Sequence, residues 1–138
     1  MENCIFCKIV KGESPCAEVF SGERVLAFLD IGPIAPGHTL VVPKTHYLNL
    51  WEVPADLAAE LLTSMQTVGR ALMKATQATG MNVVMNNFSS AGQVVMHAHW
   101  HLIPRFEGDG LFQVEQQPYA SRDALYDMAA AMQQALEH

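Results

Sequence analysis

Short apolar runs broken by Gly and Pro predict several β-strands along the chain. Residues 18–21 and 24–30 are rich in Val, Phe and Leu and flank a Gly-Glu pair, which predicts a β-hairpin. Residues 39–43 form another apolar run, and its closing proline is typical of a buried strand that ends there. Residues 82–86 and 97–104 predict two further strands on either side of an Asn-Phe-Ser-Ser-Ala-Gly loop.

Apolar residues at helical spacing predict two longer helices and one short one. After Pro54, which suits a first helical turn, apolar side chains recur at intervals of three and four residues until near Gly80. They are Leu57, Leu61, Met65, Val68 and Leu72. A second long helix is expected after the capping residue Ser121, and residues 4–11 predict one or two helical turns. Because strands come in runs without regular alternation of strand and helix, the pattern indicates an α+β fold with an antiparallel sheet.

Length, composition and charge limit the class of protein. A chain of 138 residues with 50% apolar and 16% charged residues predicts one domain, residues 1–138, with its own core. The net charge is -6 and the basic residues are scattered, which excludes a nucleic acid polymer as an expected partner but still allows a single nucleotide. No apolar run approaches the roughly 20 residues of a membrane span, and the first residues lack a secretory signal, so we expect a cytoplasmic location. Residues 136–138 resemble the start of a purification tag, and His138 is therefore left out of the functional interpretation.

The segment His97-Ala98-His99-Trp100-His101 carries the strongest chemical signal. In a strand, alternate side chains point to one face about 6.6 Å apart, so three imidazoles are expected to line one face. The apolar residues between them would pack on the other face against a helix. Burying three imidazoles without a task would cost free energy, which favours a functional interpretation.

Two chemistries fit three aligned histidines. In one, all three bind a catalytic zinc ion that keeps an open position for water. In the other, one neutral imidazole attacks phosphorus and forms a covalent intermediate that water later opens. Donors to the phosphoryl oxygens would then come from Asn86, Gln93, His101 and the amides near Gly92.

The three cysteines indicate a metal site more than a disulfide. Their number is odd, and a disulfide is not expected in a reducing compartment. Cys4 and Cys7 have the C-x2-C spacing with which two thiolates hold one zinc ion, and His46 and His97 are candidates for the other two ligands. A redox pair or two inert thiols are the alternatives. Cys16 is expected to be a packing residue or a spare thiol.

Four segments of the chain match the pattern of one known family. Residues 97–103 read His-φ-His-φ-His-φ-φ, where φ is apolar, and Ala-Gly-Gln precedes them at residues 91–93. The other segments are Cys-Ile-Phe-Cys-Lys-Ile at residues 4–9, Leu-Ala-Phe-Leu-Asp-Ile at residues 26–31, and Ala-Pro-Gly-His-Thr-Leu-Val-Val-Pro-Lys-Thr-His at residues 35–46. Over nearly its whole length, the chain thus resembles the histidine triad (HIT) nucleotide-binding family.

The resemblance implies an α+β fold with a five-stranded antiparallel sheet and two main helices, which pairs into a homodimer. It also implies a hydrolase that binds purine nucleotides and cleaves at the α-phosphate. By position, His99 matches the nucleophile, His101 a phosphate or leaving-group contact, and His38 a partner in the histidine network. The remaining matches are Asn86 and Gln93 on the phosphate side, Asp30 at the ribose hydroxyls, and Ile5, Phe6, Ile9, Phe28 and Ile31 around the base. The apolar five could equally form plain core, and Asp30 could simply end a strand.

The resemblance also bears on zinc and on the substrate. Certain bacterial members share the set Cys4, Cys7, His46 and His97, which implies a structural Zn2+ and leaves His99 free. The implied substrate is a purine nucleoside phosphoramidate or a similar conjugate, hydrolysed to the monophosphate. A dinucleoside polyphosphate hydrolase and a nucleotide-binding scaffold with weak activity are the alternatives. One departure is Val94, which stands where many members carry a hydroxyl residue near the phosphate.

Overall fold

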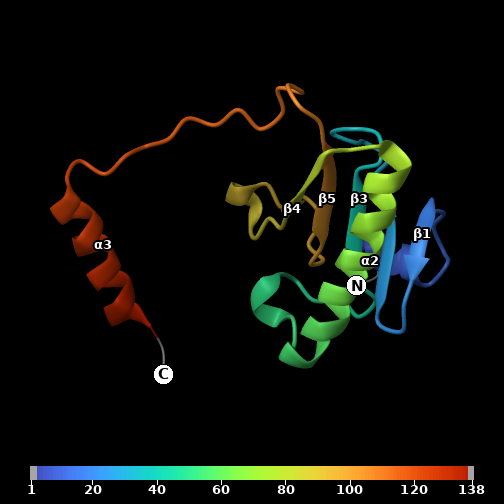
Figure 1. Ribbon diagram of the computed structural model, residues 1–138. Coiled ribbons are helices and arrows are strands. Elements are labelled where there is room, and N and C mark those ends of the chain that lie inside the picture. Colours follow the sequence, from blue (N-terminus) through green and yellow to red (C-terminus); the bar gives the residue numbers. More distant parts are fainter. Residues whose placement is uncertain (1–2, 137–138) are drawn as a thin grey trace.

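A five-stranded antiparallel sheet forms the centre of the computed structural model, which describes residues 3–136 (Figure 1). The strands follow one another in space in the order β1-β2-β3-β5-β4. They are β1 (Glu18–Ser21), β2 (Val25–Leu29), β3 (Thr39–Pro43), β4 (Gly80–Val84) and β5 (Trp100–Arg105). The α+β class and the antiparallel sheet are therefore confirmed, together with the hairpin and the strand at residues 39–43.

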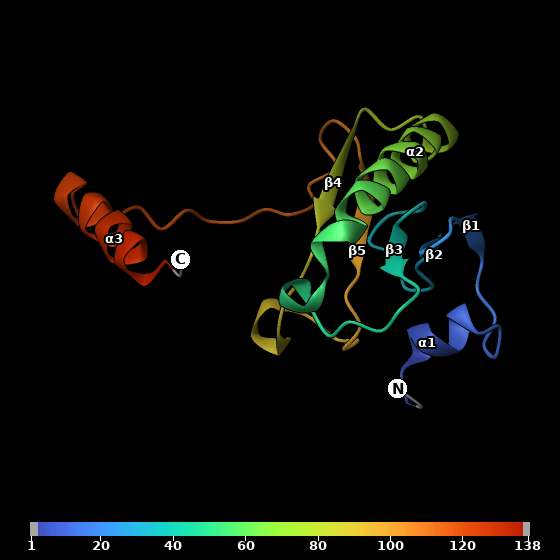
Figure 2. The ribbon, with the colours of Figure 1, turned by 90° about the horizontal axis from the view of Figure 1, so that it is seen from below.

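Helices cover both faces of the sheet (Figure 2). The helices are α1 (Ile5–Val10), α2 (Ala58–Thr76) and α3 (Arg122–Ala135), and the 3-10 turns are η1 (Leu50–Glu52), η2 (Ala55–Leu57) and η3 (Ser89–Ala91). Because side chains alternate along a strand, Val25 and Ala27 of β2 pack toward α2, whereas Leu26 and Phe28 pack toward Phe6 of α1. One apolar cluster therefore lies on each face of the sheet. The cluster around Phe6 contributes Phe6, Phe28 and Leu40 to the wall of the candidate site.

The strand that carries the histidine segment begins later in the chain than the sequence predicts. β5 begins at Trp100, and it pairs with β3 only from Thr39 opposite Leu102 to Val41 opposite Trp100. Beyond that point the Pro43 carbonyl accepts the ring Nε2–H of His97 at 2.8 Å. The predicted strand is therefore confirmed for residues 100–104, but residues 97–99 lie outside it, because the His97 ring occupies the Pro43 carbonyl that would have continued the ladder. The prediction that all three imidazoles lie on the face of this strand is wrong.

The C-terminal part of the chain stands apart from the sheet (Figures 1 and 2). Residues 106–121 lead away from β5 without forming a helix or strand, and α3 follows. Ser121 caps this helix as predicted, since its Oγ accepts the backbone N–H of Ala124 at 3.1 Å. Leu136 ends the helix, while the other residues assigned to a tag, 137 and 138, lie outside the described residues. Within residues 3–136, no helix has the length and apolar character needed to cross a membrane.

Candidate nucleotide site and metal centre

A cavity of about 380 Å³ opens between α1, β2 and the segment that leads into β5. Its volume lies in the range of small-molecule sites. Eight residues singled out from the sequence line it, namely Ile5, Phe6, Ile9, Phe28, Asp30, Ile31, His99 and His101. The fold therefore brings together an apolar wall, one carboxylate and two imidazoles, which is the set that a base, a ribose and a phosphate would need.

Hydrogen bonding determines which ring nitrogen of His99 carries the proton. Nδ1 lies 2.7 Å from the backbone carbonyl of His97, which can only accept, so Nδ1–H donates and Nε2 keeps its lone pair. The ring is 6% exposed and packs edge-on against Phe6, with centroids 5.1 Å apart. Burial lowers the pKa of His99, so the ring is neutral near pH 7. His99 thus presents an unprotonated nitrogen in the cavity wall, as a nucleophile requires.

A chain of hydrogen bonds places the proton of His101 on Nε2, the nitrogen that is unprotonated in His99. The backbone N–H of Ile34 donates to Nδ1 of His38 at 3.0 Å, so the proton of neutral His38 sits on Nε2. That Nε2–H donates to Nδ1 of His101 at 2.9 Å, which leaves the proton of His101 on its own Nε2. Burial lowers the pKa of His38 as well, so its 3.6 Å approach to Asp30 is a contact with a neutral ring rather than an ion pair. His101 is therefore a hydrogen-bond donor beside the nucleophile, at a ring-centroid distance of 4.9 Å from His99.

Asn86 and Gln93 lie outside the cavity lining. The Gln93 amide nitrogen donates to the carbonyls of Leu48 at 2.8 Å and Val95 at 3.1 Å, and its oxygen accepts the N–H of Phe88 at 2.9 Å. Asn86 donates to the Gly92 carbonyl at 3.4 Å. Both side chains brace the loop that carries η3 instead of facing the cavity, and their predicted phosphate contacts stay predictions.

Four lining residues were missed by the sequence interpretation, namely Pro15, Leu29, Leu40 and Val95. Leu40 and Val95 both contact the cavity and belong to the apolar cluster around Phe6. Leu40 lies directly opposite Phe28 in the ladder between β2 and β3, so it shares a face with Phe28. The alternation of residues 39–43, combined with the register of the hairpin, is the signal that could have identified it. Nothing comparable marks Val95, which lies in an irregular segment.

Cys4, Cys7, His46 and His97 form a tight cluster whose four donor atoms all lie within 4.8 Å of one another. The Cys4 thiol lies 3.4 Å from Nδ1 of His97, and the Cys7 thiol lies 3.4 Å from Nδ1 of His46 and 3.6 Å from Nδ1 of His97. Zinc bonds of about 2.3 Å to sulfur and 2.0 Å to nitrogen give sulfur–nitrogen edges of about 3.6 Å in a tetrahedron. The cluster therefore has the dimensions of a closed four-ligand zinc site.

The protonation states of His97 and Cys7 also favour a bound cation in this cluster. Because Nε2–H of His97 donates to Pro43, the lone pair of Nδ1 points to the thiols. Burial, together with Cys4, raises the pKa of the Cys7 thiol, so a thiolate here needs a compensating positive charge. His97 is thus separated in role from His99 and His101, and a zinc site made of the three aligned histidines does not form in the described part of the chain.

Acid is expected to destabilise the fold as the pH falls from about 6.5 toward about 4. Burial, then the neighbouring His99 and His38, lowers the pKa of His101 from 6.5 to about 4, while Asp30 opposes the shift. The unfolded chain binds its proton first, so the stabilising contribution is complete above the unfolded value and is lost as the pH falls between the two values. His101→Asn should flatten the pH dependence of the free energy of unfolding in urea titrations between pH 4 and 7. A slope equal to that of the wild type would contradict this assignment.

Comparison with known proteins identifies the family. A family model described as the HIT domain matches residues 11–108. This chain belongs to the HIT family. The "Protein hit" of Bacillus subtilis is 47% identical over 110 residues, which cover 79% of this chain and 76% of that protein. The adenosine 5'-monophosphoramidase HNT1 of Candida albicans is 39% identical over 107 residues, which cover 75% of this chain and 70% of that protein.

Solved structures of HIT proteins share the architecture. The crystal structure of SMU.412c from Streptococcus mutans matches with a TM-score of 0.91 and 44% identity, covering 99% of this chain and 87% of that one. A zinc-bound histidine triad family protein from Mycobacterium smegmatis matches with a TM-score of 0.76 and 34% identity, covering 94% of this chain and 98% of that one. A HIT relative therefore binds zinc, and the Cys/His cluster of this chain has the donors for it.

Proposed function

We propose that this HIT protein hydrolyses purine nucleoside phosphoramidates or related conjugates at the α-phosphate through a nucleotidyl-His99 intermediate. The observation that carries the proposal is the protonation pattern of the cavity, in which Nε2 of His99 is a free base and Nε2 of His101 is a donor. A nucleophile and a donor side by side are what displacement at phosphorus requires. The name of the Candida albicans relative, a monophosphoramidase acting on an adenosine compound, supports the same substrate class.

The lining of the cavity indicates how the nucleotide would lie. The apolar side chains of α1 and β2 offer faces for a purine, and Phe6 and Phe28 already pack edge to face with centroids 5.5 Å apart. Asp30 Oδ1 accepts the backbone N–H of Gly32 at 2.8 Å, and its remaining lone pairs can accept ribose hydroxyls. With base and ribose held there, the α-phosphate would reach the two imidazoles.

The reaction would then proceed in two displacements. The Nε2 lone pair of His99 forms a bond to phosphorus as the bond from phosphorus to the amine nitrogen breaks, and the departing amine takes a proton from water. The His97 carbonyl, through its bond to Nδ1–H, stabilises the positive charge that develops on the modified ring. Water then attacks phosphorus, the bond to Nε2 breaks, and the proton from that water returns to solvent as the monophosphate leaves. One water is consumed in total, and His101 donates a hydrogen bond at the phosphate in both steps.

Zinc would have a structural role in this proposal. Cys4, Cys7, His46 and His97 would hold the ion, which has no open position for water in a closed four-ligand site. The ion would fix the start of α1 to the segment that precedes β5. Val94, 87% exposed at the rim of the cavity, offers no hydroxyl to the phosphate, so the donors available there are His101 and backbone amides. We also propose that the protein acts as a homodimer.

Rates on two substrate classes test the proposed function. Adenosine and guanosine phosphoramidates should be hydrolysed to the monophosphate at least about tenfold faster, in kcat/KM, than diadenosine polyphosphates. The reason is that a cavity of about 380 Å³ would accept one nucleoside and one phosphate next to the nucleophile. Faster cleavage of the polyphosphate would favour the dinucleoside polyphosphate hydrolase, and tight nucleotide binding without turnover of either compound would favour a scaffold. A His99→Ala preparation serves as the blank for contaminating phosphatases.

A further inference from the structure

A second cavity, of about 700 Å³, adjoins the nucleotide cavity and takes no part in the steps proposed above. The two cavities share Ile5, Val94 and Val95 in their linings, so they meet between the start of α1 and the segment that leads into β5. His99 and His101 line the first cavity but not the second. The second cavity is therefore a space directly beside the reacting groups, on the other side of a border that includes the exposed Val94.

The nucleotide cavity leaves little room for the group that departs from phosphorus. Its volume of about 380 Å³ would be taken up by a purine, a ribose and the α-phosphate. The amine attached to that phosphate must then extend beyond this cavity. The larger cavity across the shared border is the space that adjoins it.

The lining of the second cavity is apolar and uncharged. Its apolar side chains are those of Ile5, Leu48, Val94, Val95 and Met96, and all of them except Val95 are more than a third exposed. Exposed apolar side chains around one cavity are typical of a ligand site. Among the residues that the structure describes, no Lys, Arg, Asp or Glu lines this cavity.

The polar groups of the second cavity are few. Cys4 and His46 are already engaged in the metal cluster, through contacts with His97 and Cys7. The amide of Asn3 is the remaining polar side chain of the lining. A ligand here would therefore meet mostly carbon and no opposite charge.

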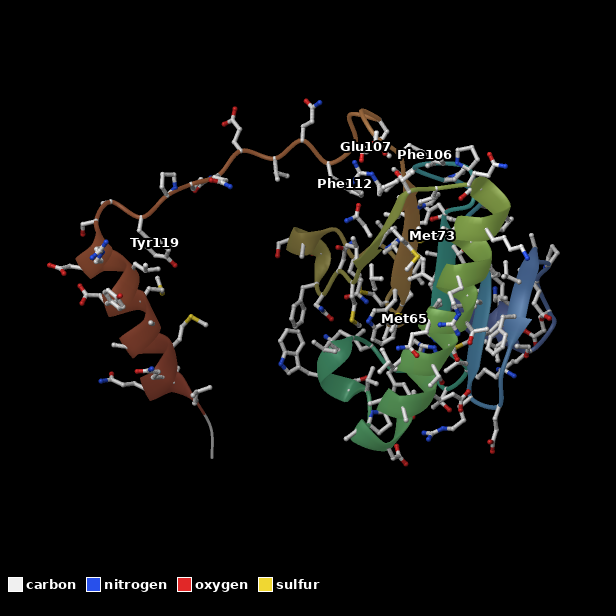
Figure 3. The ribbon with its side chains drawn as sticks, viewed as in Figure 1. Met65, Met73, Phe106, Glu107, Phe112 and Tyr119 are labelled. Atoms are coloured by element: carbon white, nitrogen blue, oxygen red, sulfur yellow. The ribbon has the colours of Figure 1, made fainter. Side chains whose placement is uncertain are left out.

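The C-terminal part of the same chain leaves this cavity open. The lining comes from three short segments, residues 3–5, 46–48 and 94–96. Figure 3 shows Phe112 and Tyr119 on the extended segment that leads away from the sheet, so these aromatic side chains do not fill the space. The cavity is therefore accessible to part of a substrate.

We propose that the second cavity binds the leaving group of the substrate, and that this group is a primary amine with an uncharged, apolar body. The inference rests on the proposed function and adds the chemical class of the amine to it. An apolar body gains free energy from burial against these side chains, whereas a carboxylate or a second ammonium group would lose water without meeting an opposite charge. The bond that breaks is still the one from phosphorus to nitrogen, and the amine still takes its proton from water.

Two substrates that differ only in the body of the amine test the proposal in the full-length protein. Adenosine 5'-phosphoramidates of propylamine and 3-phenylpropylamine both carry a primary alkyl nitrogen, so their leaving abilities are similar. The phenylpropyl compound should be hydrolysed with a kcat/KM about tenfold or more above that of the propyl compound. A third compound, with a carboxylate at the end of the propyl chain, should show no such gain. Equal kcat/KM for the phenylpropyl and propyl compounds would overturn the proposal.

A charge placed in the second cavity tests where the body of the amine binds. Leu48→Lys should reduce the advantage of the phenylpropyl compound to less than about threefold and raise kcat/KM for the carboxylate compound about tenfold relative to the propyl compound. The backbone bonds of Leu48, from Glu52 and Gln93, do not involve its side chain, which is 38% exposed, so the fold tolerates the change. The matched control is Leu62→Lys on α2, which covers the opposite face of the sheet from α1 (Figure 2) and should keep the wild-type ratios. Wild-type ratios in Leu48→Lys would overturn the assignment of this cavity.

The unsubstituted phosphoramidate separates this inference from the proposed function. Its leaving group is ammonia, which is too small to reach the second cavity, so its hydrolysis depends on the chemistry at His99 alone. Turnover of this compound, together with equal rates for the propyl and phenylpropyl compounds, would overturn the leaving-group site and leave the proposed function standing. Absence of turnover for all four compounds would overturn the proposed function and the inference with it.

Discussion

Replacing His99 with Ala should lower kcat on a nucleoside phosphoramidate by at least about 10⁴-fold while leaving nucleotide affinity within a few-fold of wild type. The substitution removes the Nε2 lone pair that would form the bond to phosphorus. It leaves Asp30 and the apolar wall of the cavity in place, so binding of the monophosphate persists. Steady-state rates and isothermal titration calorimetry of the monophosphate measure the two quantities separately. Loss of both together would indicate a misfolded cavity instead of a missing nucleophile.

The covalent step has its own signature. Wild-type protein mixed with substrate and quenched within milliseconds should carry a nucleoside monophosphate adduct on one histidine, located by mass spectrometry of the peptide that contains residues 97–105. A His101→Gln variant is the matched comparison, because it removes the donor and keeps the nucleophile, so the adduct should still map to His99. An adduct on His101, or wild-type turnover in the His99→Ala variant, would rule out the proposed intermediate.

Local sequence pattern predicts the regular elements well where one physical signal dominates. The strand at residues 39–43 is predicted to its exact bounds because an apolar run is closed by a proline, which has no N–H to donate to a ladder. The helix after Pro54 is also confirmed, since its apolar spacing matches the face that packs on β2 and β5. The start of β5 is three residues later than predicted, because His97 bonds to a carbonyl that is 54 positions away in the chain. No short stretch of sequence contains both His97 and Pro43, so a local pattern cannot predict that this hydrogen bond replaces one of the ladder.

The candidate site also has one part that the sequence predicts, its residues, and one part that only the fold shows, their protonation. The resemblance to the HIT family predicts eight residues of the cavity lining, and the Cys-x2-Cys spacing together with His46 and His97 predicts the four donors of the metal cluster. The protonation state of each ring depends on backbone groups of other segments, namely the carbonyl of His97, the carbonyl of Pro43 and the N–H of Ile34. Backbone groups have no sequence signature, so the distinction between a base at His99 and a donor at His101 requires the fold. The bracing role of Gln93 is hidden for the same reason, since all its partners are backbone atoms.

Removal of zinc should have the second largest effect, this time on stability. The purified protein should contain one zinc ion per chain by elemental mass spectrometry, and stripping it with a chelator should lower Tm by about 10–20 °C, as expected for a loss of about 3–5 kcal/mol in a chain of this size. Without the ion, two thiols and two imidazoles are left with poorly matched partners in a cluster that includes buried Cys7 and His97. Activity should fall as well, because the His97 carbonyl that orients His99 belongs to a ligand residue. Readdition of zinc should restore both properties.

The three cysteines supply an internal control for this prediction. Cys7→Ser should lose the ion and reproduce the fall in Tm, because serine is a poor zinc ligand and the Cys7 thiol contacts both histidines of the cluster. Cys16→Ser should keep the full zinc content and change Tm by less than about 5 °C, since Cys16 packs against the apolar cluster around Phe6 and is not among the four donors. Serine at either position removes one thiol, so only a metal role separates the two variants. Equal stability and equal zinc content in both would show that the cluster is held by hydrogen bonds alone, and would leave His97 with the sole task of presenting its carbonyl to His99.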